Sequence, residues 1–146
     1  AIDVTNMREA IEQTRVAGRF EEVRPRLIFD GAHNPASAKA LAETIRTLYR
    51  DARVEIVIGM LADKDVASVL RVLEPVADAF YFVNVNNPRA ATAEQLMALS
   101  TAREKTVVTD VGAFLQQLVA EGTVRIVTGS LYLLASIREQ VLQRLV

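Results

Sequence analysis

Five short apolar runs, rich in β-branched residues, recur along the chain between longer segments with helical periodicity. Because consecutive residues of each run are apolar, both faces of the strand are expected to be buried, as in a parallel sheet. Strands that alternate with helices form βαβ units with right-handed crossovers. The pattern predicts a doubly wound, Rossmann-like α/β fold. The predicted strands are 27–30, 54–59, 79–84, 105–109 and 123–128, and the predicted helices are about 36–50, 64–76, 92–101, 110–120 and 130–145.

The first 24 residues follow a different pattern. Asn6 and Glu9 fit a capping box at the start of a short helix. Residues 20–23 are expected to form a short strand that adds an antiparallel edge to the sheet. We therefore expect an N-terminal helix and edge strand over 1–24, followed by an α/β domain over 25–146. That domain would carry about five parallel strands, with helices on both faces of the sheet.

Composition narrows the classes of function. Apolar residues make up 51% of the 146 residues, enough for a sizeable core, yet no apolar run approaches the roughly 20 residues of a membrane span. A net charge of −1 provides no basic surface for nucleic acid. With no cysteine and one histidine, the chain cannot build thiolate or histidine-based metal sites. We expect a cytoplasmic protein with no nucleic-acid partner, no membrane partner and no metal site of its own.

One loop joins a strand end to a helix start in an arrangement that suits a ligand. Residues 30–35 read Asp-Gly-Ala-His-Asn-Pro and directly follow an apolar run. In open α/β sheets, ligands bind beyond the carboxyl ends of the strands. Asp30 could accept two hydrogen bonds from a ribose diol, and His33 with the free N–H groups of the next helix suits a phosphate. On these residues alone, a turn capped by Asp30 with a surface histidine explains the loop equally well.

The helix after this loop has a clear start signal. Asn34 is expected to cap it, with Pro35 at the first helical position, where the missing N–H costs nothing. Leu41, Ile45 and Leu48 then recur at helical spacing and are expected to face the sheet.

Other polar residues follow the predicted strand ends. Lys64 lies between two acids near a predicted helix start. A lysine there is usually an ordinary surface charge. Because a cation at this position opposes the helix dipole, a ligand-binding role is the alternative interpretation. Ser130 fits a helix cap or a contact to an anionic ligand, Arg89 fits the surface, and Arg19 is ambiguous. The Gly-x-Gly-x-x-Gly, Gly-x-x-x-x-Gly-Lys-[Ser/Thr] and Gly-x-Ser-x-Gly patterns are absent. The sequence thus has no phosphate loop with which to hold a nucleoside triphosphate by itself.

Five ordered segments carry a family resemblance over most of the chain. Besides 30–35, they are Gly-Arg-Phe-Glu at 18–21, Gly-Met-Leu-Ala-Asp-Lys-Asp at 59–65, Pro-Arg-Ala at 88–90 and Thr-Gly-Ser-Leu-Tyr at 128–132. Together they resemble the C-terminal domain of the folylpolyglutamate synthase/dihydrofolate synthase family of Mur-type ligases. The resemblance implies an ATP- and Mg²⁺-dependent ligase that phosphorylates a carboxylate of folate or dihydropteroate. The amine of L-glutamate then attacks the acyl phosphate, and ADP and phosphate are released.

The resemblance also implies roles for individual residues. Asp30 would bind the ribose, while His33 would reach the nucleotide phosphates. Lys64 would contact a carboxylate of the incoming glutamate and, with His33, take part in catalysis. The residues implied for nucleotide binding are Arg19, Asp30, His33 and Asn34, and those for glutamate binding are Lys64, Ser130 and Tyr132.

Two departures from the family pattern limit what the chain can do alone. Val16-Ala17 stands where the family has Trp-Pro before Gly-Arg, which weakens the inference for Arg19. The phosphate loop, the magnesium ligands and most of the folate site of such enzymes belong to a preceding ATPase domain, which this sequence lacks. We expect a domain of a longer ligase that is inactive and holds no cofactor alone. The alternatives are a stand-alone nucleotide-binding or regulatory module and a domain of a cell-wall Mur ligase.

Overall fold

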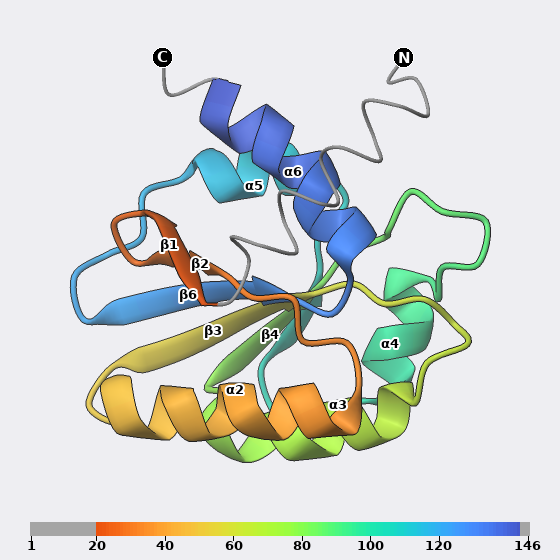
Figure 1. Ribbon diagram of the computed structural model, residues 1–146, viewed down its shortest axis with the longest axis horizontal. Coiled ribbons are helices and arrows are strands. Elements are labelled where there is room, and N and C mark those ends of the chain that lie inside the picture. Colours follow the sequence, from red (N-terminus) through yellow and green to blue (C-terminus); the bar gives the residue numbers. More distant parts are fainter. Residues whose placement is uncertain (1–19, 144–146) are drawn as a thin grey trace.

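The computed structural model describes residues 20–143, and within this range six strands form one sheet with helices on both faces (Figure 1). The strands are β1 (Glu21–Arg24), β2 (Leu27–Phe29), β3 (Arg53–Ile58), β4 (Ala79–Phe82), β5 (Lys105–Val107) and β6 (Thr123–Thr128). The helices are α2 (Pro35–Leu48), α3 (Val66–Leu73), the 3₁₀ helix η1 (Glu74–Val76), α4 (Ala93–Leu99), α5 (Val111–Gln116) and α6 (Leu131–Gln143). The helix predicted near Asn6 lies outside the described residues.

The sheet has the order β1-β2-β6-β3-β4-β5. Strand β1 runs antiparallel to β2 at one edge, and the other four pairings are parallel. The prediction of five parallel strands with one antiparallel edge strand is therefore confirmed. At the centre, β3 and β6 pair from Arg53 opposite Thr123 to Ile58 opposite Thr128.

Side chains of the central strands point alternately into two separate cores. Ile28, Ile56 and Ile126 pack on the side covered by α2, α3 and α4. Phe29 and Val127 point to the opposite side, where α5 and α6 cover the sheet. Burial on both faces explains why the strands read as continuous apolar runs. Within the described residues, none of the helices combines the length and apolarity needed to span a membrane.

Two neighbouring strands send their helices to opposite faces. Helix α2 follows β2 and packs in one core, whereas α6 follows β6 and packs in the other. This divergence is a topological switch point, and open α/β sheets bind ligands in the crevice at such a point, beyond the carboxyl ends of the strands. The fold therefore places residues 30–34 and residues 129–130 side by side at the position where α/β sheets bind ligands.

Side-chain caps determine where the helices begin. Asn34 Oδ1 accepts the N–H of Ser37 at 2.8 Å, and Ser37 Oγ accepts the N–H of Asn34 at 3.2 Å. This closes a capping box, with Pro35 as the first helical residue, so the predicted helix start is confirmed. The next three α-helices begin directly after the capping residues Asp65, Thr92 and Asp110.

The predicted helix over 110–120 is longer than α5, which ends at Gln116. Two side chains of the first hairpin contact the segment that follows α5. Arg24 donates to the carbonyl of Gln117 at 3.2 Å, and Arg26 donates to the carbonyl of Val119 at 2.9 Å. These carbonyl groups lie just beyond the last helical residue, so the hairpin fixes the chain where it leaves the helix. The segment is thus held by tertiary contacts that periodicity does not reveal.

Leu48 also differs from the prediction, because it is 59% exposed and does not face the sheet. It is the last residue of α2, where the helix ends. The residues of α2 that are buried in the core are Ala38, Leu41, Ala42 and Ile45.

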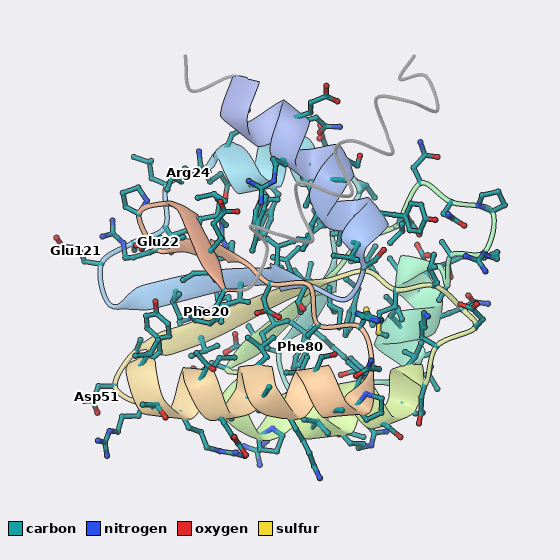
Figure 2. All side chains as sticks on the ribbon, viewed as in Figure 1. Phe20, Glu22, Arg24, Asp51, Phe80 and Glu121 are labelled. Carbon is teal, nitrogen blue, oxygen red and sulfur yellow. The ribbon has the colours of Figure 1, made fainter. Side chains whose placement is uncertain are left out.

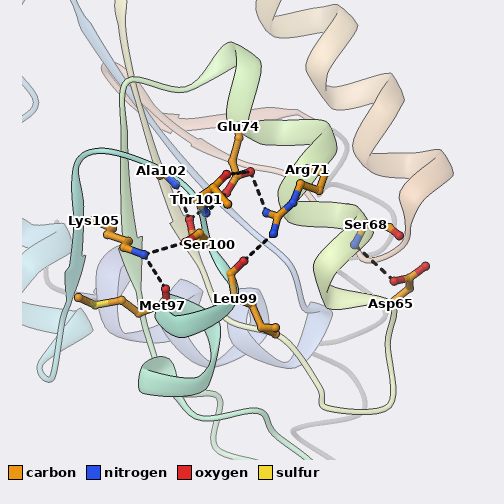
Figure 3. A network of polar contacts seen from close by, with 10 residues as sticks. All are labelled: Asp65, Ser68, Arg71, Glu74, Met97, Leu99, Ser100, Thr101, Ala102 and Lys105. Carbon is orange, nitrogen blue, oxygen red and sulfur yellow. Dashed lines mark hydrogen bonds and ion pairs between the residues drawn. The ribbon is translucent and has the colours of Figure 1, made fainter.

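A polar network joins the end of α3 to the end of α4 (Figure 3). Glu74 accepts hydrogen bonds from the hydroxyl of Ser100 at 2.9 Å, from the N–H of Thr101 at 2.7 Å and from the hydroxyl of Thr101 at 2.8 Å. Arg71 pairs with the same carboxylate at 2.9 Å. Lys105 donates to the carbonyl of Ser100 at 2.7 Å, which ties β5 into the network.

Replacement of Glu74 by glutamine is expected to lower the free energy of unfolding by about 1–3 kcal/mol at pH 7. Burial alone would raise the pKa of Glu74, but hydrogen bonds from Thr101 and Ser100 and the charge of Arg71 outweigh it and hold the pKa below its usual range. A carboxyl group with a lowered folded-state pKa contributes stability above its unfolded pKa and loses it as pH falls through the folded pKa.

The difference in the free energy of unfolding between wild type and Glu74→Gln should therefore become smaller as the pH falls below about 4. Urea unfolding at a series of pH values measures this difference. Glu104→Gln is the matched control, because Glu104 forms only an exposed ion pair with Arg53 and should cost less than about 1 kcal/mol. A gap that does not change with pH would show that the charge of Glu74 is not what stabilises the network.

Candidate functional site

The loop after β2 is centred on the half-buried carboxylate of Asp30. Its backbone N–H donates to the carbonyl of Val127 in β6 at 3.0 Å, which continues the sheet by one residue. The carboxylate accepts the N–H of Ala32 at 2.9 Å and the N–H of Phe20. Burial raises the pKa of Asp30 above its usual range, and these two hydrogen bonds offset the rise in part. Because a carboxylate has about four acceptor positions, it can still accept from a ligand hydroxyl.

His33 lies in the same loop and is also half-buried. Its Nδ1 lies 3.0 Å from the carbonyl of Gly31. A carbonyl can only accept, so Nδ1 carries the hydrogen, and Nε2 is the ring nitrogen left for another partner. The backbone N–H groups of His33 and Asn34 both donate to Ser37 Oγ, at 3.1 and 3.2 Å. Some of the N–H groups that the sequence suggested for a phosphate are therefore already used within the loop.

Backbone atoms join the ends of three strands beside this loop. The hydroxyl of Thr128 and the N–H of Gly129 both donate to the carbonyl of Ala32, at 3.2 and 2.9 Å. Gly129 has φ +105, and a Cβ there would lie 2.4 Å from the carbonyl oxygen of Gly59. Only glycine fits this close approach in this conformation. These contacts thus hold the ends of β2, β6 and β3 in fixed register.

Ser130 follows this floor and begins α6. Its Oγ accepts the N–H groups of Tyr132 at 3.1 Å and Leu133 at 3.4 Å, and the residue is 3% exposed. The helix-cap interpretation of Ser130 is therefore confirmed. The hydroxyl hydrogen remains able to donate one bond. Tyr132 is half-buried and packs at the margin of the α5 and α6 core.

Lys64 is exposed in the turn that precedes Asp65, the cap of α3. It thus lies outside the helix, and its ammonium group does not sit in the first turn against the helix dipole. Its backbone N–H donates to Leu61, and its carbonyl accepts the N–H of Val66, at 3.3 and 2.9 Å. The side chain is therefore presented from a turn whose backbone is fixed at both ends.

The loop that carries Lys64 is paired with the loop after β4. Leu61 and Ala90 form an isolated antiparallel bridge. The N–H of Ala62 donates to the carbonyl of Arg89 at 2.7 Å, and the guanidinium of Arg89 pairs with Asp63 at 3.3 Å. The two loops therefore form one platform beyond the carboxyl ends of β3 and β4.

Residues 18–131 match the sequence model of the family described as "Mur ligase, glutamate ligase domain". The chain belongs to this family. A dihydrofolate synthase/folylpolyglutamate synthase of Escherichia coli K12 is 45% identical over 93 residues, which are 62% of this chain and 22% of that protein.

Two solved structures are similar to this glutamate ligase domain. One is E. coli FolC in complex with DHPP and ADP, at 36% identity and a TM-score of 0.79, covering 89% of this chain and 32% of that one. The other is a bifunctional folylpolyglutamate synthase/dihydrofolate synthase with Mn, AMPPNP and L-glutamate bound, at 32% identity and a TM-score of 0.75, covering 86% of this chain and 31% of that one. This chain spans about a fifth to a third of the length of these relatives.

The glutamate ligase domain brings most of the predicted site residues to one end of the sheet. Asp30, His33 and Asn34 share the loop after β2, and Ser130 begins the adjacent helix. Lys64 stands on the loop after the next strand in the sheet, β3. Arg19 lies outside the described residues. In the described part of the chain, no group of three or more His, Cys, Asp or Glu side chains could hold a metal ion.

The sequence did not reveal two features that shape this end of the glutamate ligase domain. One is the hydrogen bonding of Thr128 and Gly129 to Ala32, which joins β2 to β6. The other is the ion pair of Arg89 with Asp63, which joins two loops. The sequence predicted a surface position for Arg89, and its side chain is exposed. Both depend on contacts between distant segments. The only sequence signal was that Gly129 and Arg89 lie in the segments that follow predicted strands.

Proposed function

We propose that this domain is the C-terminal part of an ATP-dependent ligase that joins L-glutamate to folate or dihydropteroate. The observation that carries the proposal is its similarity to E. coli FolC in complex with DHPP and ADP, at 36% identity and a TM-score of 0.79. A half-buried carboxylate and an imidazole at the topological switch point support it independently, because that crevice is where α/β sheets bind nucleotides.

On the nucleotide side, the Asp30 carboxylate accepts hydrogen bonds from the two ribose hydroxyl groups. It uses the lone pairs that are not taken by the N–H groups of Ala32 and Phe20. His33 donates from Nε2–H to a phosphate oxygen while Nδ1–H is held by the carbonyl of Gly31, so the ring binds the phosphates as an imidazolium cation. Asn34 fixes the loop by capping α2. Arg19 supplies a further positive charge to the phosphates.

On the amino-acid side, the ammonium group of Lys64 pairs with a carboxylate of L-glutamate. Ser130 and Tyr132, at the start of α6, contribute hydroxyl groups. The exposed position of Lys64 suits a substrate that arrives after the nucleotide. The γ-phosphoryl group of ATP passes to the carboxylate of the acceptor. The amine nitrogen of glutamate then attacks the acyl carbon, a proton leaves the amine and phosphate departs.

The rest of the site belongs, in this proposal, to an ATPase domain that precedes this one in the complete protein. That domain holds Mg²⁺, which neutralises charge on the transferred phosphoryl group. The two domains together supply the alignment on which the rate depends, so this domain alone is inactive. The complete enzyme acts in the cytoplasm.

The test is a ligase assay on the complete natural protein that contains this chain, measuring ADP release. Release should require L-glutamate together with folate or dihydropteroate. Release with a muropeptide acceptor instead would assign the domain to a cell-wall ligase. A natural protein that binds ATP tightly by calorimetry without any ligase activity would identify a stand-alone nucleotide-binding module.

Lys64→Ala tests the amino-acid side of the proposal in the same assay. It should raise the KM for glutamate at least about tenfold, because an ion pair that binds a substrate carboxylate is worth about 1.4 kcal/mol or more. Lys39→Ala is the matched control, since Lys39 is an exposed lysine on α2 and should leave the KM unchanged. Equal KM values for both variants would remove Lys64 from the site.

A further inference from the structure

The first two described residues of the chain hold the edge strand β1 from both sides of the sheet. Phe20 lies on the α2 side, where its ring stacks on Tyr49 with centroids 6.0 Å apart (Figure 2). The carboxylate of Glu21 points to the other side and pairs with Arg138 of α6. Successive side chains of a strand point to opposite faces, so these two residues reach both helical layers. We call Phe20, Glu21, Tyr49 and Arg138 the β1 clasp.

The backbone at Phe20 explains why these contacts matter. Phe20 has φ +56, in the left-handed region that a bulky side chain rarely adopts. Glu21 pairs with Phe29 in the sheet, so the backbone of Phe20, one residue earlier, lies beside Asp30, and its N–H is a hydrogen-bond partner of the Asp30 carboxylate. Such a conformation persists only when surrounding contacts hold it. The stack on Tyr49 and the neighbouring Glu21–Arg138 pair are those contacts.

Packing restricts the side chain of Arg138. Its side chain is 15% exposed, and its guanidinium lies 5.6 Å from the ring centroid of Phe29, the residue before Asp30. Its buried Nε has no hydrogen-bond partner among the described residues. The pair with Glu21 is therefore the polar contact that keeps Arg138 against β2, directly beside the Asp30 loop.

We infer that the β1 clasp positions the Asp30 carboxylate for the ribose of the bound nucleotide. Two hydrogen bonds hold that carboxylate: the N–H of Ala32 comes from its own loop, and the N–H of Phe20 comes from the residue before β1. Without the second bond, only the N–H of Ala32 restrains the carboxylate, on one of its two oxygens. The inference rests on the proposed role of Asp30 in nucleotide binding. The clasp residues are positioning residues, because they act through Asp30.

A purely structural role of the clasp predicts a different result. Loosening an edge strand lowers stability and affects all substrates alike. Positioning of Asp30 instead raises the KM for ATP while the KM for glutamate and kcat stay unchanged. The two roles are therefore separated by the ratio of the two KM values.

The first experiment uses this chain and hydrogen exchange. In Glu21→Ala and Tyr49→Leu, the Phe20 amide should exchange at least about tenfold faster, while the amide of Ile56 in β3 keeps its wild-type rate. Tyr49→Phe retains the ring and should restore slow exchange. Wild-type exchange of the Phe20 amide in both clasp variants would overturn the inference, because the clasp would then not hold the bond to Asp30.

The second experiment measures kinetics of the complete ligase. Glu21→Ala and Tyr49→Leu should raise the KM for ATP about five- to twentyfold, with the KM for glutamate within twofold of wild type, and Tyr49→Phe should behave as wild type. Glu104→Ala is the matched control, because it removes only the exposed ion pair of Glu104 with Arg53. An unchanged KM for ATP in the clasp variants, with a large rise in Asp30→Ala, overturns the inference and leaves the proposed function intact. No rise in Asp30→Ala overturns the inference together with the proposed role of Asp30, whereas the ligase function itself fails only if ADP release does not depend on L-glutamate and folate or dihydropteroate.

Discussion

Asp30→Ala is expected to lower kcat/KM for ATP by at least about 100-fold, equivalent to a loss of about 2.7 kcal/mol of transition-state stabilisation. The carboxylate lies at the switch point between β2 and β6 and is already oriented by the N–H groups of Ala32 and Phe20. Alanine removes the only side chain in the loop that can accept both hydroxyl groups of a ribose. The measurement is steady-state kinetics with ATP varied at saturating glutamate.

Asp30→Asn separates this loss of function from any loss of stability. Because burial raises the pKa of Asp30, the folded state binds its proton more tightly than the unfolded state does. Stability therefore decreases as pH rises from the unfolded pKa to the folded pKa, and the ionised group costs stability above that range. Asparagine removes this cost and keeps an acceptor for Ala32.

The Tm of Asp30→Asn at pH 7 should accordingly equal or exceed that of wild type, while kcat/KM for ATP falls at least about tenfold. The stability gain should disappear at acidic pH, where Asp30 is protonated in both states. Wild-type kinetics combined with a lowered Tm would mean that Asp30 serves only as the cap of a turn.

The sequence predicts the central sheet well because local and tertiary preferences agree there. The apolar runs at β3 and β6 have only one environment that buries both faces. The capped start of α2 needs only Asn34, Pro35 and Ser37, which are close in sequence. By contrast, the chain that follows the early end of α5 is held by Arg24 and Arg26, about ninety residues away. No local pattern contains that information.

The candidate site shows the same division. The rule that ligands bind beyond strand ends was enough to select Asp30, His33, Lys64 and Ser130 as candidates. It could not reveal that Ser37 uses N–H groups of the first loop, or that Phe20 completes the partners of Asp30. These details come from side-chain hydrogen bonds, which are set only after the elements have packed.

Two charged residues within the apolar runs were not explained by the sequence, and they form a buried pair. Glu55 of β3 and Arg125 of β6 lie opposite each other and are 7% and 9% exposed. Arg125 donates to Glu55 Oε1 through Nε at 3.0 Å and Nη2 at 2.8 Å, and its guanidinium lies 4.3 Å from the ring centroid of Phe114. The pair thus neutralises two charges that would otherwise oppose burial, while the buried Nη1 of Arg125 has no hydrogen-bond partner among the described residues.

Arg125→Ala is expected to destabilise the domain by about 3–5 kcal/mol, because it leaves the carboxylate of Glu55 buried without its main partner. Arg53 and Tyr81 contact only the other oxygen of Glu55, at 3.3 and 3.5 Å. Urea unfolding of Arg125→Ala, Glu55→Ala and the double variant measures the coupling between the two residues. Additive effects of the single variants would show that the pair is not coupled.

Replacement of both partners by apolar residues should be far less costly. The double variant Glu55→Leu with Arg125→Met should lie within about 1–2 kcal/mol of wild type, since no charge remains buried. The pair nevertheless constrains register, because a slip of β3 against β6 would place Glu55 opposite apolar residues. The same register brings Gly59 against Gly129 beyond the ends of β3 and β6. The apolar double variant should therefore keep its stability, while the amide NMR signals of Gly59 and Gly129 broaden or split. Sharp signals at the wild-type positions would show that the contact between the glycines fixes the register without the charged pair.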